Sequence, residues 1–170
     1  MPLTKYPWPL LRLLRTGQVN AARLPLALSA PLLTLRTGNT MISTLFGSVG
    51  SPSTSAVTFM GVHGSSAPNA VETVRFELVG AAFTMQNFNI SASPAPVGGA
   101  SYTYTVRKNQ NDTAITVTIT GSATTGSYTG AGVSFAAGDI ITIGITPAST
   151  PTAPTTLRWN LQADSGSTHF

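Results

Sequence analysis

A regular alternation of apolar and hydroxyl side chains is clearest in residues 101–121, SYTYTVRKNQNDTAITVTITG. Apolar residues recur at every second position, which is the spacing that puts successive side chains on opposite faces of a strand. Between the two alternating runs, residues 108–112 favour a turn, because Asn and Asp bond the local backbone and tolerate positive φ. The pattern predicts a β-hairpin with one apolar face that must cover a core. The inward residues are Tyr102, Tyr104, Val106, Ile115, Val117 and Ile119.

Four further strands are predicted before this hairpin, and the first three lie at residues 41–46, 57–62 and 71–79. In the third of these, alternation predicts an apolar row on one face and a polar row on the other. The inward row is Val74, Phe76 and Leu78, and the outward row is Thr73, Arg75 and Glu77.

A strand that carries Phe83, Met85, Phe88 and Ile90 alternates but changes phase halfway along. One extra residue in a strand produces such a change. We therefore expect a β-bulge near Gln86-Asn87.

After the hairpin, residues 127–136 predict a weaker strand, and Gly138-Asp139 predict a turn. Two more alternating runs follow, with the inward residues Ile141, Ile143 and Ile145, then Leu157, Trp159 and Leu161. Short strands at regular spacing with few helical signals are typical of an all-β fold. We predict an antiparallel sandwich of about eight strands.

Charge is unevenly distributed along the chain. Charged residues make up only 8% of the 170 residues, while Ser and Thr together number 43. Residues 1–39 carry five of the nine cations and none of the five acids, so their net charge is +5; residues 40–170 carry a net charge of −1. A surface with so few charges suits extensive packing against neighbours, and basic terminal segments commonly reach a partner. This asymmetry predicts two parts, an arm at residues 1–39 and a β-domain at residues 40–170.

The arm should be extended and mostly irregular, because five prolines exclude a long helix. It is also too apolar to remain solvated as a disordered tail. Two interpretations stay open: the arm folds back on its own domain, or it lies extended on another subunit. In the second case the partner-binding residues would be aromatic, aliphatic and basic anchors, namely Tyr6, Trp8, Leu10, Arg12, Arg15, Arg23 and Arg36.

Residues 57–162 resemble a module that recurs in bacteriophage structural proteins. The matching motifs are the Tyr-x-Tyr-x-Val-Arg-Lys-Asn hairpin of residues 102–109, the Thr/Val/Ile strand of residues 113–120, the Thr-Thr-Gly turn of residues 124–126, the Ala-Ala-Gly-Asp opening of residues 136–139 and the Pro-Thr-Ala loop of residues 151–153. The resemblance implies a jelly roll similar to the tumour necrosis factor-like fold, which usually assembles as trimers. Such modules occur in capsid decoration (cement) proteins and in tail fibres or spikes, and the pattern brings no catalytic residues with it.

No residue pattern points to catalysis or metal binding. Cysteine is absent, so thiolate metal sites and disulfides are excluded. His63 and His169 are the only histidines, and we interpret His63 as a loop residue. Asp139 should organise a turn, with calcium binding as the alternative. Glu72 and Glu77 fall on opposite faces of the predicted strand, so they form no acid–base pair.

We therefore expect no enzyme activity, no metal and no cofactor. Arg107 and Lys108 at the hairpin tip are interpreted as solvated charges. Nucleic-acid binding by the arm is the less favoured reading, because its five cations are diluted by leucine and proline. The apolar stretch of residues 24–33 is too short to span a bilayer, and we expect neither a signal peptide nor membrane association.

The leading hypothesis is a virion structural protein on the outer surface of the capsid. It would be a homotrimeric decoration (cement) protein that stabilises a phage head, with its arm clamping neighbouring subunits of the major capsid protein. The alternative is a tail fibre or spike module that binds a host receptor or carbohydrate through the loops at residues 64–69, 93–100 and 147–154. Those loops contain no Trp or Tyr, the residues usual in sugar-binding loops. A jelly-roll capsid or minor vertex subunit is a third possibility.

Overall fold

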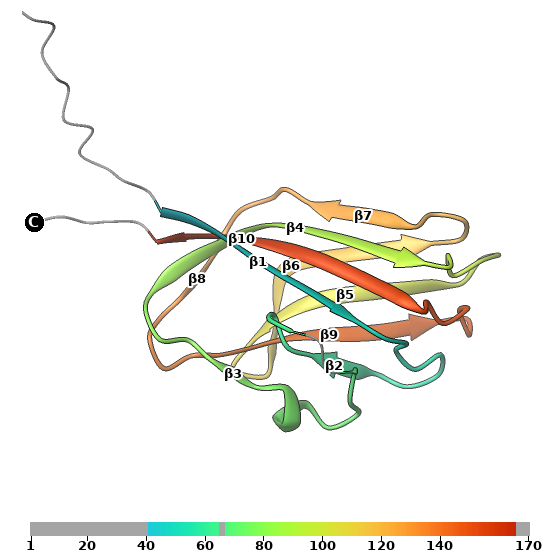
Figure 1. Cartoon of the computed structure of the whole chain (residues 1–170), viewed down its shortest axis with the longest axis horizontal. Helices are drawn as coiled ribbons and strands as arrows, with labels where there is room; N and C mark the ends of the chain where they lie inside the picture. Colours follow the sequence, from blue (N-terminus) through green and yellow to red (C-terminus); the bar gives the residue numbers. More distant parts are fainter. Residues whose placement is uncertain (1–40, 65–66, 166–170) are drawn as a thin grey trace, which may run out of the picture. The chain divides into compact units, whose positions relative to one another are not determined.

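The computed structural model describes residues 41–64 and 67–165 (Figure 1). The predicted arm and its seven partner-binding residues lie outside the described residues, as does His169. The described chain forms ten β-strands and one short 3-10 turn, arranged as two antiparallel sheets of five strands each. The predicted all-β class and the antiparallel pairing are confirmed, and the described strands number ten rather than about eight.

The first sheet is built around β4 (Phe83–Ser93) and β10 (Thr156–Ser165), which pair with each other. The strand β1 (Met41–Val49) adds to the other side of β10. Two short strands, β7 (Thr125–Tyr128) and β8 (Val133–Phe135), pair with successive parts of β4. Both of them therefore lie on the side of β4 away from β10.

The second sheet has the predicted hairpin at one side. The strands β5 (Ser101–Lys108) and β6 (Asn111–Thr120) form this hairpin, and β9 (Ile140–Ala148) pairs with β5. The far side of β9 pairs with β2 (Thr58–Met60) and, further along, with β3 (Glu77–Leu78). These two short strands share one edge of the sheet.

Strand pairing is nested along the chain. β1 pairs with β10, β2 and β3 pair with β9, β4 pairs with β7 and β8, and β5 pairs with β6. Each pair joins strands equally far from the central hairpin, so most contacts link segments remote in sequence. The pairs β10–β4 and β9–β5 then join these units into two sheets.

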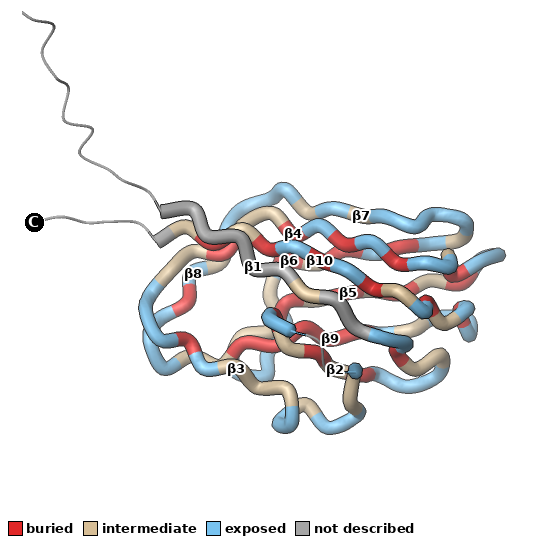
Figure 2. Tube along the Cα trace, viewed as in Figure 1, coloured by how far each residue is buried: buried red, intermediate tan, exposed pale blue. Residues whose placement is uncertain are grey.

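The core lies between the two sheets, and Figure 2 shows buried residues on strands of both. The inward rows expected from the hairpin, from β9 and from β10 are all buried. Phe88 and Ile90 of β4 are buried with them, and Phe135 of β8 stacks on Phe83 with ring centroids 5.2 Å apart. Alternation therefore located most of the core correctly.

The hairpin turn and the β-bulge predicted from the sequence are both present in the structure. The hairpin turns through Asn109 and Gln110, whose φ angles of 50° and 66° are those of a two-residue turn that follows the twist of the strands. In β4, the pairing with β10 shifts between Leu161 and Gln162, and Asn87 has a φ of 47°. The β-bulge expected near Gln86-Asn87 is confirmed.

Trp159 links the two sheets at their edge. Its indole Nε1 donates a hydrogen bond of 3.0 Å to the carbonyl oxygen of Val62, which follows β2. Its ring lies against Gly47 of β1, where an added Cβ would be 2.2 Å from the ring. Only glycine allows this close approach, and a β-bridge between Gly47 and Gly64 lies beside it.

The strand predicted at residues 71–79 is wrong for most of its length. Residues 72–75 form the 3-10 turn η3 (Glu72–Arg75), and only β3 is extended. Val74 and Leu78, expected in the core, are 56% and 75% exposed, and Val79 is buried instead. A shift of one residue exchanges the two faces of a strand, which explains the reversal at Leu78 and Val79.

The strand predicted at residues 127–136 is interrupted. β7 ends at Tyr128, and β8 begins at Val133. Between them the Tyr128 hydroxyl donates a hydrogen bond of 2.9 Å to the carbonyl oxygen of Ala131.

In the part of the chain that the structure describes, no helix is long and apolar enough to cross a membrane.

Replacing a core tyrosine should stabilise the protein. The Tyr104 hydroxyl is fully buried with no hydrogen-bond partner among the described residues, and burial raises the pKa of this tyrosine. An unsatisfied buried hydroxyl carries a desolvation cost, so Tyr104→Phe should raise the free energy of unfolding by about 1 kcal/mol in urea titrations. Tyr128→Phe is the matched control and should lower it or leave it unchanged, because that hydroxyl is bonded. A loss of stability in Tyr104→Phe would contradict this account.

Candidate functional site

A polar cluster lies on the outer face of the second sheet, where the β5–β6 hairpin ends. Its centre is Arg107, which alternation places on the outer face because Val106 faces the core. Arg107 Nε donates a hydrogen bond of 2.8 Å to Glu72 Oε1, and the guanidinium also contacts the carboxylate of Asp112. Glu72 Oε1 accepts a further bond of 2.7 Å from the Thr142 hydroxyl. The ion pair between Glu72 and Arg107 holds η3 over the sheet, and both side chains are largely shielded, at 11% and 20% exposed.

The Arg107 side chain also packs on apolar neighbours. Its guanidinium carbon lies 5.5 Å from the centroid of the Phe59 ring, a cation–π contact. A Cβ at Gly144 would lie 3.1 Å from Arg107 Cδ, so the missing side chain there leaves room for the arginine stem. Arg107 thus joins β2, η3, β5 and the start of β6 in one contact group.

Asp139 organises the neighbouring turn, as the sequence predicted. Its carboxylate accepts hydrogen bonds of 2.7 Å from the Ala136 backbone N–H and 2.7 Å from Asn109 Nδ2, and Lys108 Nζ lies 3.0 Å away. The Asn109 side chain in turn accepts a bond of 2.8 Å from the Ile140 backbone N–H. These hydrogen bonds and the ion pair hold the hairpin tip against the turn before β9. They lower the pKa of Asp139 to about 2, mainly through the bond from Ala136 and then through Asn109 and Lys108.

The solvated interpretation of Arg107 and Lys108 is therefore wrong. Arg107 is 20% exposed and paired with two acids, and Lys108 pairs with Asp139 and donates to the Ser134 carbonyl oxygen at 2.9 Å. Alternation put Arg107 on the correct face but could not show that a distant segment covers that face. The sequence does contain one indication of this cover. The outward positions of β9 are Thr142 and Gly144, whose small size leaves room for another segment to pack on that face.

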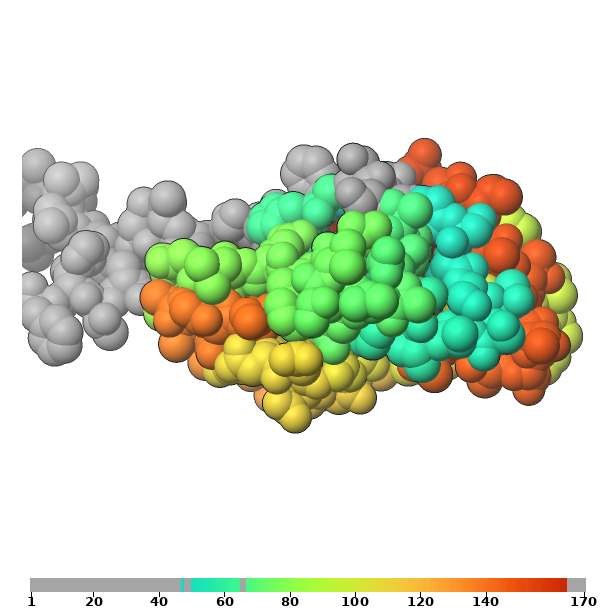
Figure 3. Space-filling view, turned by 90° about the horizontal axis from the view of Figure 1, so that it is seen from below, coloured from blue at the N-terminus to red at the C-terminus, as the bar shows by residue number. Residues whose placement is uncertain are grey.

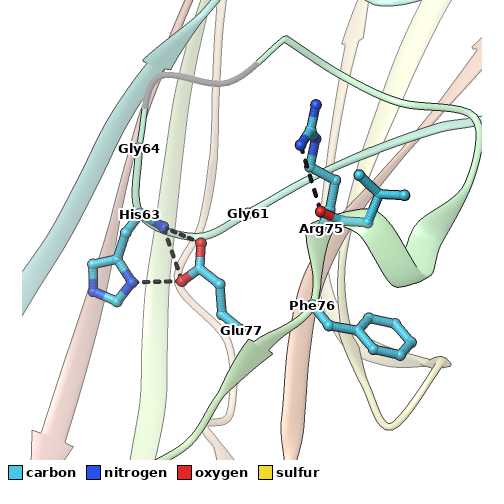
Figure 4. A pocket seen from close by; sticks show the side chains of 7 residues that line it. Gly61, His63, Gly64, Arg75, Phe76 and Glu77 are labelled. Carbon is cyan, nitrogen blue, oxygen red and sulfur yellow. Dashed lines mark hydrogen bonds and ion pairs between the residues drawn. The ribbon is translucent and has the colours of Figure 1, made fainter.

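A second polar group joins His63 to Glu77 (Figure 4). The Glu77 carboxylate lies 2.5 Å from His63 Nδ1 and accepts the His63 backbone N–H at 3.0 and 3.2 Å. A carboxylate on Nδ1 orients the imidazole and favours the tautomer with its proton on that nitrogen. His63 lies in a loop, as predicted. Glu72 lies in η3 and Glu77 in β3, so the prediction that they lie on opposite faces of one strand is wrong.

The His63–Glu77 pair borders a pocket of about 140 Å³. The other lining residues are Gly61, Gly64, Val74, Arg75 and Phe76. Figure 4 shows Glu77 turned toward His63, while Phe76 points away from them. Among the described residues, no lining side chain carries a hydroxyl or thiol, and Glu77 already binds the His63 main chain and ring. We therefore assign the pair to holding the loop of residues 61–64 against β3. Among the described residues, no group of three acids and histidines is arranged to hold a metal ion.

Hydrogen bonds also hold the loop before η3 against the second sheet. Arg75 donates two hydrogen bonds, of 3.1 Å from Nε and 2.6 Å from Nη2, to the carbonyl oxygen of Ala67. Asn69 exchanges two backbone bonds with Phe59 of β2, and its side chain accepts the Val71 N–H at 2.7 Å. Residues 67–78 are thus tied to the second sheet at several points.

This fastened segment displays aliphatic side chains to solvent. Val71 is 54% exposed, Val74 56% and Leu78 75%; we call these three residues the apolar strip. Val71 directly precedes η3, and Val74 lies within it. In Figure 3 the segment that carries them, drawn in green, occupies the centre of the face toward the viewer.

A shallow polar groove of about 590 Å³ lies on the first sheet. Strand pairing places two rows of residues side by side across β10, β4 and β7. The rows are Asn160, Asn89 and Ser127, then Arg158, Ser91 and Thr125. Asn89 Nδ2 donates to Asn160 Oδ1 at 2.8 Å, which orients both amides. The groove presents amides, hydroxyls and one guanidinium, and sequence patterning did not identify it.

Comparisons with known proteins return no relatives: no family model, no curated protein and no solved structure matches this chain.

The Glu72–Arg107 pair should stabilise the body measurably. Hydrogen bonds between shielded charged groups contribute about 1.5 kcal/mol or more. A double-mutant cycle with Glu72→Gln and Arg107→Gln, read by urea unfolding, should give a coupling energy of about that size. The matched cycle with Asp112→Asn should give less than about 0.5 kcal/mol, because the Asp112 side chain is 66% exposed. If the coupling energy of the Glu72–Arg107 pair equals that of the Asp112–Arg107 pair, Glu72 does not anchor η3 to the sheet.

Asp139 should make stability sensitive to acid. Its folded pKa is lowered from 3.8 to about 2, so the carboxylate stabilises the fold fully above about pH 4, and this contribution is lost as pH falls toward 2. In thermal unfolding measured between pH 6 and pH 2, Asp139→Asn should show a shallower fall in Tm below pH 4 than the unmodified chain. Parallel Tm profiles below pH 4 would rule out Asp139 as an acid-sensitive group.

Proposed function

We propose that this protein is a virion structural protein, a capsid decoration (cement) protein that trimerises on the outer surface of a phage head. The observation that carries this proposal is the nested strand pairing. β1–β10, β2/β3–β9, β4–β7/β8 and β5–β6 are the pairs expected when one long antiparallel hairpin is rolled into two sheets, as in a jelly roll. That topology supports the resemblance to phage jelly-roll modules drawn from residues 57–162.

The surface of the body favours assembly over catalysis. Only nine charged residues lie in residues 40–170, and at least seven of them are concentrated around η3, β3 and the hairpin tip. Most of these are engaged in pairs within the chain, so a neighbouring subunit could approach with little desolvation of isolated charge. The low charge and the exposed apolar strip are features of proteins that pack against other subunits.

The leading residues supply a second kind of contact in this proposal. Residues 1–39 contain 11 of the 15 leucines of the chain as well as the net charge of +5. We propose that they clamp neighbouring capsid subunits, with Tyr6, Trp8 and Leu10 as apolar anchors and the arginines pairing with acids of the major capsid protein. Three such arms on one trimer would add their affinities through avidity.

A second candidate is a fibre or spike module that binds carbohydrate. The polar groove on the first sheet favours it, because amide, hydroxyl and guanidinium groups match the hydroxyls of a sugar. Among the residues lining the groove, the one aromatic, Trp159, is only 4% exposed and cannot stack on a sugar ring. We therefore rank the decoration protein first. Binding to host-cell polysaccharide but not to heads would reverse that order.

Binding of the full chain to purified heads tests the proposal. Heads that lack this protein should bind the chain in co-sedimentation, and the double variant Tyr6→Ala/Trp8→Ala should weaken binding tenfold or more, because buried aromatic anchors dominate interface energies. The body variant Val97→Ala, at an exposed position, is the control and should bind unchanged. Full affinity after deletion of residues 1–39 would refute the clamping role.

A further inference from the structure

Exposed aliphatic side chains are concentrated in one short segment of the body. Among the described residues, five large hydrophobic side chains are exposed, and three of them, the apolar strip, fall within residues 71–78. The other two are Val97, in the loop between β4 and β5, and Val57, which precedes β2 near the strip, since Phe59 of β2 pairs with Asn69. Single exposed valines need no explanation, whereas a cluster of exposed aliphatics marks an interaction surface.

The apolar strip is held in one conformation before any partner arrives. Glu72 fixes η3 to Arg107 and Thr142, and Glu77 fixes β3 to His63. Arg75 fixes the preceding loop through the Ala67 carbonyl oxygen. A surface that is already ordered loses little entropy on binding, which favours affinity.

The charges around the strip indicate what the partner must carry. Each of Glu72, Glu77 and Lys108 lies within 3.0 Å of a group of opposite charge or of the His63 ring. Arg75 differs, because its side chain donates hydrogen bonds to carbonyl oxygens, and among the described residues no carboxylate lies within 4.0 Å of it. The strip therefore combines aliphatic side chains with one cation that lacks a counter-charge.

We propose that the apolar strip docks a segment of another protein in which aliphatic side chains flank a carboxylate. The aliphatic side chains would cover Val71, Val74 and Leu78, and the carboxylate would lie opposite Arg75. This inference rests on the proposed function, under which that partner is the major capsid protein. The strip would then be a second contact with the head, separate from the arm.

Charge argues against the two occupants that this chain itself could provide. Residues 1–39 contain five cations and no acid, so an arm laid on the strip would bring positive charge toward Arg75. A second copy docked strip to strip would bring two Arg75 side chains together. Like charges at an interface oppose binding, and the partner of opposite charge is preferred.

The test compares the sign of a charge introduced at Leu78. This side chain is 75% exposed, so a charged residue is tolerated by the fold. In co-sedimentation of the full chain with purified heads, Leu78→Asp should weaken binding about tenfold more than Leu78→Lys. A negative charge three residues from Arg75 repels the carboxylate that lies opposite Arg75, whereas a positive charge attracts it. Val97→Asp is the matched control away from the strip and should bind like the unmodified chain.

The outcomes separate this inference from the proposed function. If the unmodified chain binds heads and both Leu78 variants bind equally well, the docking role of the strip is wrong while the proposed function stands. If Leu78→Asp instead converts the free protein to a smaller species in sedimentation velocity, the strip joins copies of this chain and the inference is overturned. If the unmodified chain does not bind heads, the proposed function fails and this inference fails with it.

Discussion

The period-two alternation of the β5–β6 hairpin is the constraint on which the rest of the structure depends. Tyr102, Tyr104 and Val106 on one strand and Ile115, Val117 and Ile119 on the other are all buried, so the hairpin has a continuous apolar face. Such a face requires a cover, and the chain supplies one by adding strands on either side in nested pairs. The first sheet, which covers this face, follows from this requirement, and Trp159 of β10 joins the two sheets through its hydrogen bond to Val62.

The same alternation determines the polar outer face. Since Val106 points inward, Arg107 points outward, where it binds Glu72 and draws η3 onto the sheet. That single contact links the hairpin of the core to the segment that displays Val71, Val74 and Leu78. The surface proposed to meet a partner is therefore positioned by the element that organises the fold.

Prediction from sequence succeeded where local periodicity decides the structure. The hairpin, its Asn109 turn, the bulge at Asn87 and the row of Leu157, Trp159 and Leu161 follow from alternation and turn chemistry within a few residues. It failed at residues 71–79, where the local pattern resembles a strand but the Glu72–Arg107 contact spans 35 residues and folds the segment into a turn. The alternation of apolar and polar residues within one segment gives no information about contacts between residues so far apart in the sequence. The polar groove was missed for a similar reason, because its rows form only when β10, β4 and β7 are aligned.

The structural body and its leading segment have different roles in the proposed function. Under that proposal the body would form the trimer and carry the docking surface, and residues 1–39, with a net charge of +5, would bind the neighbouring capsid subunits. The most direct test of this division is the solution mass of the full chain and of residues 40–170, measured by light scattering with circular dichroism to verify folding. We predict a trimer for both, with the full chain near three times its mass of 17.6 kDa. A trimer that forms only when residues 1–39 are present would contradict it, because the arm would then hold copies of this chain together instead of the head.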